Sequence, residues 1–483
     1  MRRVRGNEEG APDRVLPSRE DPVARATSEV LGGPLGPRAL AGVSAARALP
    51  VLLALTTLAM VLAVLVKQHC RTQGWDAPGQ FVHLCYSDLP SLFFFRDIGS
   101  GAVPYLSDVP PDAVVEYPVL TGLVMWVTAL LVPGSGETAE RALTYFDVNV
   151  VGLAACALVL VWATAVTARR RPWDALLVAV SPSLVLAATV NWDLWAVALL
   201  ALSMLAWARE RPVLAGVLLG LATAAKFYPL LVLGPLLVLC LRAGLLRTWW
   251  RTLGAAVLAW LAVNVPVALA APEEWARFYL FSRERGAGFS SVWYVMYQQG
   301  VGVPTVSALN LLATGLLVAC CAGVAWLAVA APRRPRLAQL AFLVVAAFLL
   351  TNKVYSPQYV LWLLPLAALA RPVWRDHLVW TAGEVVHFVG IWLFLAGFPN
   401  DGDPDRALPE GPYGVTVLLH VAGTLWLVAL VVRDVLHPEH DPVRASGDDD
   451  PHGGPLDGAP DRLVLGPARR AARARHAAPA VRP

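Results

Sequence analysis

Hydrophobic residues occur along this chain in long runs that are separated by short polar junctions. Most runs are about 15 to 25 residues long, which is the length of a helix that crosses a ~30 Å hydrocarbon layer. The alternation and regular turns of an outer-membrane barrel are absent from these runs. The pattern predicts an all-α polytopic membrane protein with helices near residues 49–66, 118–132, 148–167, 174–190, 192–208, 212–225, 227–241, 252–271, 304–331, 337–351, 357–371, 376–397 and 413–433.

The composition agrees with a membrane-embedded chain. Hydrophobic residues make up 57% and charged residues 15% of the 483 residues. Soluble domains carry about 25% charged residues, so a soluble multidomain enzyme is excluded. Polar sequence at both ends predicts disordered cytoplasmic tails over residues 1–47 and 436–483. The membrane domain is therefore expected to be residues 48–435.

Arginine residues mark every second junction between the apolar runs, and the positive-inside rule predicts that these junctions are cytoplasmic. They lie at 169–171, 209–211, 242–251, 333–336, 371–375 and 433. The other junctions then face outward, including a large first external loop over 67–117 and a second over 272–303. Thirteen crossings would separate the termini, so we expect about 12 transmembrane helices, with 118–132 partly inserted or re-entrant. A hidden extra crossing would repair the parity equally well.

The first external loop is acidic and contains the strongest candidate for a catalytic base. Asp88 precedes an apolar stretch, Leu92 to Phe95, that predicts a short interfacial helix. A carboxylate at the membrane surface is partly desolvated, and its basicity rises. Two interpretations remain open, because Asp88 either acts as a base or only caps this helix. Glu116, at the end of the loop, is either a ligand for a sugar hydroxyl or a solvated loop acid.

Two of the three lysines lie in apolar surroundings. Lys226 stands just before Tyr228, and Lys353 is followed by Tyr355 and Gln358 in a junction between two apolar runs. Because a cation in or beside the bilayer is costly, it usually faces a polar cavity or an anion. We therefore predict an outward-facing site for an anionic headgroup, with phosphate as the natural candidate. The alternative is that the lysines snorkel to the interface.

Other candidate binding residues lie near the same predicted face. Asp193 stands between two apolar segments, where an acid is costly unless it is hydrated or paired. Arg283 and Arg285 precede aromatic and amide side chains over 290–299, which are residue types that bind sugars or form an interfacial aromatic belt. The residues assigned to substrate binding are Glu116, Asp193, Lys226, Tyr228, Arg283, Arg285, Lys353, Tyr355 and Gln358.

Metal and nucleotide sites are not indicated. The six cysteines form no metal-binding pattern, and no metal ligand is predicted. Cys70 and Cys85 share the first external loop and can pair if that loop faces an oxidising compartment. His387 lies in an apolar run and is interpreted as a satisfied core histidine. The chain has neither a Walker-type loop nor a Rossmann fingerprint, so no cofactor is expected and a sugar donor would be lipid-linked.

Several short motifs, in their order along residues 48–435, resemble glycosyltransferase family 87 of the GT-C class, the polyprenyl-phosphomannose-dependent mannosyltransferases. These motifs are Tyr86-Ser87-Asp88, Arg96 to Tyr105, Val115-Glu116-Tyr117-Pro118, Asn191-Trp192-Asp193, Lys226-Phe227-Tyr228-Pro229 and Asn352 to Tyr359. The resemblance implies the GT-C glycosyltransferase fold and a metal-independent reaction. It also implies that Asp88 matches the catalytic aspartate of the family.

The resemblance further implies a multi-pass plasma-membrane hexosyltransferase whose active site faces outward. Such an enzyme would transfer a hexose, mannose in this family, from a polyprenyl-phosphate sugar to a cell-envelope glycolipid or glycan, with inversion. The implied partners are that donor, the acceptor and membrane lipid, without nucleic acid. The alternative is a secondary transporter of an anionic or lipid-linked substrate, because transporters also break helices near polar sites. A non-catalytic envelope scaffold is a third possibility.

Overall fold

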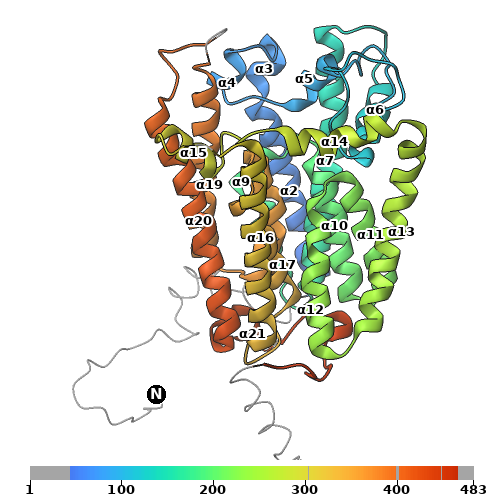
Figure 1. Cartoon of the computed structure of the whole chain (residues 1–483), viewed down its shortest axis with the longest axis vertical. Coiled ribbons are helices and arrows are strands. Elements are labelled where there is room, and N and C mark those ends of the chain that lie inside the picture. The colour runs from blue at the N-terminus through green and yellow to red at the C-terminus, as the bar shows by residue number, and fades with distance from the viewer. Residues whose placement is uncertain (1–43, 303, 399–401, 446, 448, 466–483) are drawn as a thin grey trace, which may run out of the picture.

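The computed structural model describes residues 44–302, 304–398, 402–445, 447 and 449–465. Over these residues the protein is helical and has no strand. The helices pack side by side in one bundle, with short helices covering one end of it (Figure 1). The predicted all-α architecture is therefore confirmed.

Six helices of the described chain are long and apolar enough to cross a membrane. They are α2 (Ala45–Val66), α7 (Ala139–Thr167), α13 (Leu246–Ala270), α16 (Val306–Ala330), α19 (Trp374–Leu395) and α20 (Glu410–Leu436). The predicted number of about 12 spans is not confirmed, because the other apolar runs form shorter helices. These include α6 (Val119–Leu130), α10 (Asp193–Ala208), α11 (Pro212–Ala225), α12 (Leu233–Ala243), α17 (Leu337–Thr351) and α18 (Val360–Ala370).

The shorter helices end at polar residues or prolines that interrupt the apolar runs. α11 has 14 residues, or about 21 Å at 1.5 Å per residue, which is less than the ~30 Å hydrocarbon layer. It ends at Lys226, and η3 (Tyr228–Val232) carries the chain on to α12. α17 likewise ends at Asn352 before η4 (Pro357–Tyr359) and α18. The predicted 174–190 helix is divided into η2 (Pro172–Ala175), α8 (Leu176–Ala179) and α9 (Pro182–Ala187).

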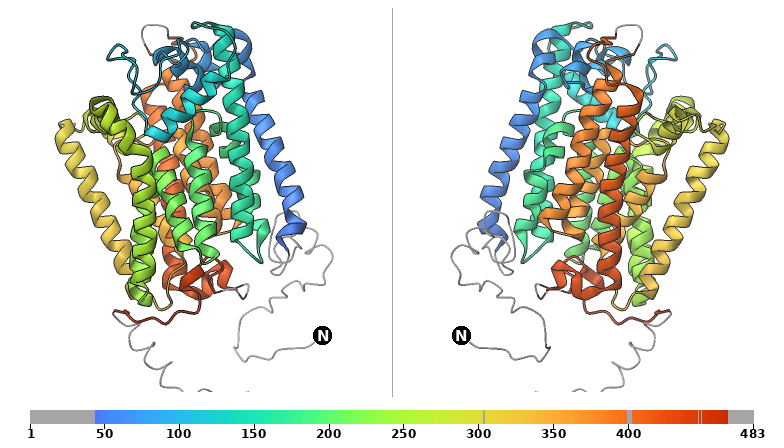
Figure 2. Two further views of the ribbon diagram at one scale, coloured as in Figure 1. Left: turned by 90° about the vertical axis from the view of Figure 1, so that its right-hand side faces the viewer. Right: turned by 90° about the vertical axis from the view of Figure 1, so that its left-hand side faces the viewer.

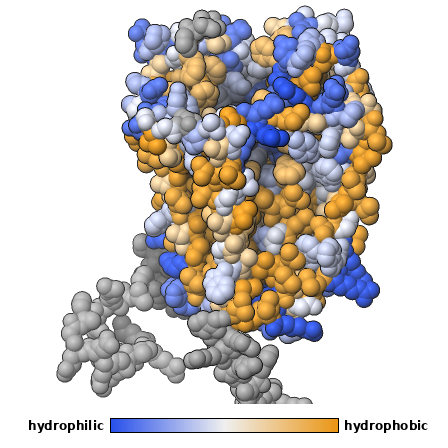
Figure 3. Space-filling view, in the orientation of Figure 1, coloured by the Kyte–Doolittle hydropathy of each residue, from blue (hydrophilic) through white to orange (hydrophobic). Residues whose placement is uncertain are grey.

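The largely buried helices α10, α17 and α18 form the centre of the bundle, and several long helices surround it. Every residue of α18 is buried, whereas only 17% of the most apolar window is buried in α13 and in α16. A helix that is apolar on all sides and buried belongs to a core. α2 and α16 lie at opposite edges in the side views (Figure 2). The visible surface is hydrophobic around its middle and hydrophilic at both ends (Figure 3), as expected for a membrane-embedded protein.

Both predicted external loops lie at the same end of the bundle (Figure 1). The first contains α3 (Gln68–Gln73), α4 (Gly79–Val82) and α5 (Asp88–Phe95), and the second contains α14 (Pro272–Glu284) and α15 (Val292–Gln298). The short helix expected around Leu92 to Phe95 is thus α5. Cys70 and Cys85 form a disulfide bond, 15 residues apart. Closing a loop of this length contributes ~3 kcal/mol in the chain-entropy model.

The predicted disordered C-terminal tail is wrong for the described residues between 437 and 465. After α20 the chain forms η5 (Pro438–His440), α21 (Pro442–Ala445) and η6 (Gly454–Leu456). This segment folds against the end of the bundle that carries the arginine-rich junctions. Asp441 pairs with Arg336, and Asp461 pairs with Arg242. These two carboxylates are thus paired with arginines that are distant in sequence. The predicted tail over 1–47 and residues 466–483 lie outside the described residues, except that α2 begins at Ala45.

Candidate active site

A cavity of about 930 Å³ lies at the end of the bundle where the two loops gather. Its walls come from the first loop, from the helix breaks near 191, 226 and 352–358, from the segment 278–290, and from the outer part of α19. Eight of the ten predicted site residues line it: Asp88, Glu116, Lys226, Tyr228, Arg285, Lys353, Tyr355 and Gln358. The interrupted helices thus bring polar residues from distant parts of the sequence to one place.

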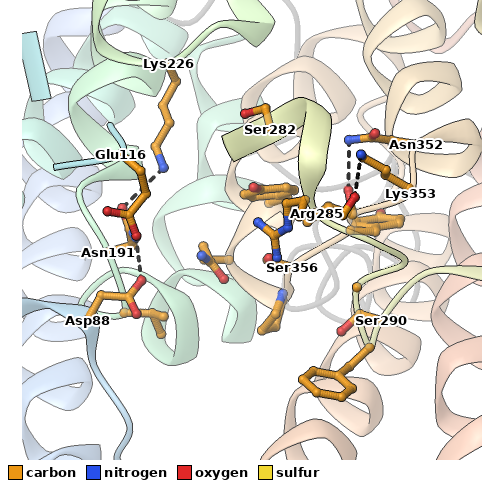
Figure 4. A pocket seen from close by; sticks show the side chains of 18 of the residues that line it. Asp88, Glu116, Asn191, Lys226, Ser282, Arg285, Ser290, Asn352, Lys353 and Ser356 are labelled. Atoms are coloured by element: carbon orange, nitrogen blue, oxygen red, sulfur yellow. Dashed lines mark hydrogen bonds between the residues drawn. The ribbon is translucent and has the colours of Figure 1, made fainter. Parts of the chain in front are cut away.

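Asp88 points into this cavity from the first turn of α5 (Figure 4). The helix is capped by Ser87, whose hydroxyl accepts a hydrogen bond from the backbone N–H of Leu89, so the capping interpretation of Asp88 is wrong. Tyr86 donates its hydroxyl to Asp88 Oδ1 at 2.5 Å, and Asn191 donates to Oδ2. Burial raises the pKa of the Asp88 carboxyl, while both hydrogen bonds act in the opposite direction. The result is a carboxylate of increased basicity that is held in a fixed orientation.

The side chain of Asn191 connects this carboxylate to Lys226 (Figure 4). Its Nδ2 donates to Asp88 and, at 2.7 Å, to the Tyr117 hydroxyl. Its Oδ1 accepts from the Trp192 backbone N–H at 2.6 Å and from Lys226 Nζ at 3.3 Å. The amide therefore uses both donors and its acceptor, which fixes the spacing between the acid and the cation.

Lys226 does not snorkel, because it is only 9% exposed and has protein partners. Its Nζ lies 3.5 Å from Asp193 Oδ1 and 5.0 Å from the centroid of the Tyr117 ring. Asp193 is completely buried beneath the cavity and also accepts a hydrogen bond from Trp362 Nε1 at 2.7 Å. Asp193, which is predicted to bind substrate, does not line the cavity in this structure. Its carboxylate balances the charge of Lys226.

The opposite wall carries two further cations, Arg285 and Lys353 (Figure 4). Lys353 Nζ donates to the backbone carbonyls of Arg283 and Arg285, at 3.1 and 2.6 Å. Burial and the neighbouring Arg285 lower the pKa of Lys353. Among the described residues, the Arg285 guanidinium has no carboxylate partner and lies 5.4 Å from the centroid of the Phe281 ring. The side chain of Arg283 is exposed and does not line the cavity, so its predicted place in the site is wrong.

Glu116 lines the cavity, but both of its oxygens are already engaged. Arg96 donates to them from Nη2 and Nε at 2.5 and 2.7 Å. A bidentate pair of this kind fixes the carboxylate and neutralises it. Glu116 is therefore less available as a base than Asp88, whose partners are an amide and a hydroxyl.

Aromatic side chains form much of the remaining surface. Tyr228 stacks on Trp362 with ring centroids 4.2 Å apart, and Tyr86 stacks on Trp392 at 4.5 Å. Of the predicted sugar-binding stretch 290–299, the cavity contains Ser290 but none of its aromatic residues. Trp392 was missed because it occurs within an apolar run of what becomes α19, where a tryptophan carries no distinct signal.

Lys67 was also missed, although it is the third of the three lysines. It is buried at the end of α2, and its Nζ donates to the backbone carbonyl of Tyr86 at 2.8 Å. Burial lowers the pKa of Lys67 to about 7, partly offset by the charge of Asp88. The rarity of lysine could have identified it. Its position at the start of a polar loop gives no other signal of a role.

The fold and this cavity are those of a polytopic membrane protein with a polar site at one end. The sequence profile of glycosyltransferase family 87 matches residues 116–352 of the chain. The predicted resemblance is thereby confirmed over these residues, and this region of the chain belongs to glycosyltransferase family 87, a family of membrane glycosyltransferases. No curated protein sequence matches the chain. The matched region includes Glu116, Asn191, Lys226, Arg285 and Asn352, all of which line the cavity.

Proposed function

We propose that this glycosyltransferase transfers a hexose, specifically mannose, from a polyprenyl-phosphate donor to a cell-envelope glycolipid or glycan. The observation that carries the proposal is the arrangement of charge in the cavity. A hydrogen-bonded carboxylate of raised pKa, Asp88, stands on one wall, and the cations Arg285 and Lys353 stand on the other. A glycosyl phosphate needs both groups, because the acceptor must lose a proton while the phosphate gains negative charge.

In the proposed reaction, Asp88 Oδ accepts the proton of the acceptor hydroxyl as that oxygen attacks the anomeric carbon. The bond between this carbon and the phosphate oxygen breaks, and its electron pair leaves with the lipid phosphate. Arg285 lines the cavity and has no carboxylate partner among the described residues, so its guanidinium is available to this anion; such a group binds phosphate oxygens in a bidentate manner. Attack opposite the leaving group inverts the configuration, so a β-linked donor gives an α-linked product.

The remaining polar residues have positioning roles in this proposal. Tyr86 and Asn191 orient the Asp88 carboxylate, and Asn191 fixes Lys226 beside it. Lys226 is balanced by Asp193, so it contributes a local dipole more than a free charge. We place the cavity on the outer side of the plasma membrane. The arginine-rich junctions at the opposite end and the Cys70–Cys85 disulfide support this orientation.

The direct test is sugar transfer by the purified full chain in detergent or proteoliposomes, with synthetic polyprenyl-phosphomannose as donor and a membrane lipid extract as acceptor. We expect a mannosylated lipid to be detected by mass spectrometry. Donors with glucose and galactose test the choice of sugar. If none of the lipid-phosphate sugars supports transfer, the proposed donor class is wrong.

Replacing Arg285 by Met is expected to raise the KM for the donor about 10- to 100-fold, because a charge-assisted contact of ~1.5–3 kcal/mol is lost. The matched control is Arg283→Met. It removes the same charge from a position two residues earlier, where the side chain lies outside the cavity. Steady-state kinetics with varied donor concentration separate the two. Equal KM values for both variants would remove Arg285 from the phosphate site.

The rate of transfer is expected to fall as the pH drops through the raised pKa of Asp88, because only the ionised carboxylate accepts a proton. The acidic limb of the profile should thus lie at a higher pH than an ordinary aspartate would give. Asn191→Ala removes a hydrogen bond that lowers this pKa, and we expect it to move the limb further toward high pH. An unchanged limb in this variant would mean that another group controls it.

A further inference from the structure

A second cluster of ionisable side chains lies between α19 and α20, behind the cavity wall. It consists of Glu384, His387 and His420, and their possible ligand atoms all lie within 4.8 Å of one another. Both histidines are completely buried, and Glu384 is 4% exposed. In the described structure neither ring nitrogen of His387 has a hydrogen-bond partner, so the prediction of a satisfied core histidine is wrong. Such an unpartnered buried group requires an explanation.

The two helices approach closely enough at this point to share a ligand. A Cβ added at Gly383 would lie 2.8 Å from the backbone oxygen of Leu419, and one at Gly423 would lie 3.3 Å from Cα of Trp380. These glycines allow the backbones to approach each other. Glu384 and His387 are three residues apart and therefore share one face of α19.

The two carboxylate oxygens of Glu384 have different surroundings, and only Oε2 faces the histidines. Oε1 faces three donors, the Trp380 indole N–H at 3.1 Å, the Thr424 hydroxyl at 3.3 Å and the Tyr355 hydroxyl at 3.4 Å. Oε2 lies 3.4 Å from Nδ1 of His420. The set of donors on Oε1 is typical of the outer partners that orient a metal-binding carboxylate.

Both ring nitrogens of His420 face an oxygen atom that accepts hydrogen bonds. Nε2 lies 3.4 Å from the backbone carbonyl oxygen of Ser290, and Nδ1 lies 3.4 Å from Oε2 of Glu384. A neutral imidazole carries only one N–H, so it can donate to one of these oxygens but not to both. At the other contact two lone pairs repel each other unless a positive centre, either a second proton or a metal ion, lies beside them. The two unpartnered nitrogens of His387 favour the metal ion.

We propose that Glu384, His387 and His420 bind a divalent transition-metal ion, for which Zn²⁺ is the best match. Two imidazole nitrogens and one carboxylate oxygen are a common ligand set for zinc. Ligand atoms in a tetrahedral site with bonds of ~2.1 Å stand about 3.4 Å apart, and the Glu384–His420 distance already has this value. The rings of His387 and His420 are stacked with centroids 4.1 Å apart. His387 must therefore rotate about its soft Cβ–Cγ torsion to direct a nitrogen at the ion.

The position of the site indicates that the ion has a positioning role. Tyr355 and Ser290 line the cavity, and they also contact Glu384 and His420. A bound ion would therefore join α19 to α20 and fix this part of the cavity wall. None of the three ligands lines the cavity itself. The inference is independent of the proposed sugar-transfer reaction.

The test is the metal content of the full chain, purified without chelators and without a histidine tag, by inductively coupled plasma mass spectrometry. We expect about one Zn²⁺ per chain, and loss of this ion to background in His387→Gln and His420→Gln. His377→Gln is the matched control, because this residue is a buried histidine on the same helix outside the cluster. His440→Gln is a second control, because His437, Glu439 and His440 form an exposed group that can bind zinc adventitiously.

A second measurement keeps the test valid if a variant folds poorly. Chelator treatment of the wild-type protein should lower its Tm, and added Zn²⁺ should restore it, because a ligand that binds only the folded state stabilises that state. His387→Gln should show neither change. The proposal is overturned if the wild-type protein holds no ion as purified and after Zn²⁺ addition, or if only His440→Gln loses it. The first outcome would leave a shared proton between Glu384 and His420.

Discussion

Asp88→Asn is expected to reduce the turnover of sugar transfer by ~10²- to 10⁴-fold, the usual contribution of a positioned general base. Asparagine preserves the shape of the side chain and accepts hydrogen bonds through its carbonyl oxygen, but it cannot take up a proton. α5 should still form, because Ser87 caps it. The loss should therefore appear in kcat more than in the KM for the donor.

The measurement is steady-state transfer of mannose by purified variants. Asp108→Asn serves as the matched control, since Asp108 is an exposed carboxylate of the same loop that does not line the cavity. Binding of the intact donor to Asp88→Asn, by isothermal calorimetry or tryptophan fluorescence, distinguishes lost chemistry from lost folding. Transfer at the wild-type rate by Asp88→Asn would exclude it as the base. Glu116 would then be the next candidate for the base. To act as one, it would first have to break its ion pair with Arg96.

Asp441→Asn is expected to destabilise the folded protein by about 3–5 kcal/mol, which is the usual cost of removing one partner from a buried ion pair. Arg336 and Asp441 are both completely buried and are joined by two hydrogen bonds of 2.9 Å. Arg336 also donates to the backbone carbonyls of Leu369 and Ala370 at the end of α18. Without the carboxylate, this buried guanidinium loses its direct ion-pair partner.

Thermal unfolding of the detergent-solubilised chain measures this effect as a fall in Tm. The control is Asp449→Asn, because Asp449 is 69% exposed at its side chain where it pairs with Arg444, and exposed pairs contribute ~0–1 kcal/mol. The double variant Arg336→Met with Asp441→Leu should recover most of the lost stability, since a buried pair can be replaced by apolar residues of similar volume. Equal Tm values for Asp441→Asn and Asp449→Asn would show that the segment after α20 does not stabilise the bundle.

The sequence by itself determined the class of protein and the end of the bundle that holds the site. Apolar runs of membrane length, interrupted at Asn191, Lys226 and Asn352, follow directly from residue types. The alternation of arginine-rich and acidic junctions assigned these breaks to one side, and the structure places all three at one cavity. This inference succeeds because hydrophobic burial and the cost of charge in hydrocarbon act on each segment independently of its neighbours.

Only the tertiary structure decided which charges are free and which are paired. In the sequence, Glu116 and Asp193 look as available for substrate as Asp88. In the structure, Glu116 forms an ion pair with Arg96 and Asp193 forms one with Lys226. Arg283 and Arg285 are equivalent by type, but only one lines the cavity. Pairing depends on contacts between side chains that are far apart along the chain, and no local pattern encodes these contacts.

The same reason explains the segment after α20 and the cluster around His387. A polar segment is predicted to be disordered when its side chains interact only with water. Here Asp441 and Asp461 instead form ion pairs with buried arginines more than 100 residues away in the sequence. His387 looks like an ordinary core residue until the packing of α20 places His420 against it. The sequence determines which chemical groups this protein contains. Whether a buried charged or polar group stabilises or destabilises the fold depends on the neighbours that helix packing places beside it.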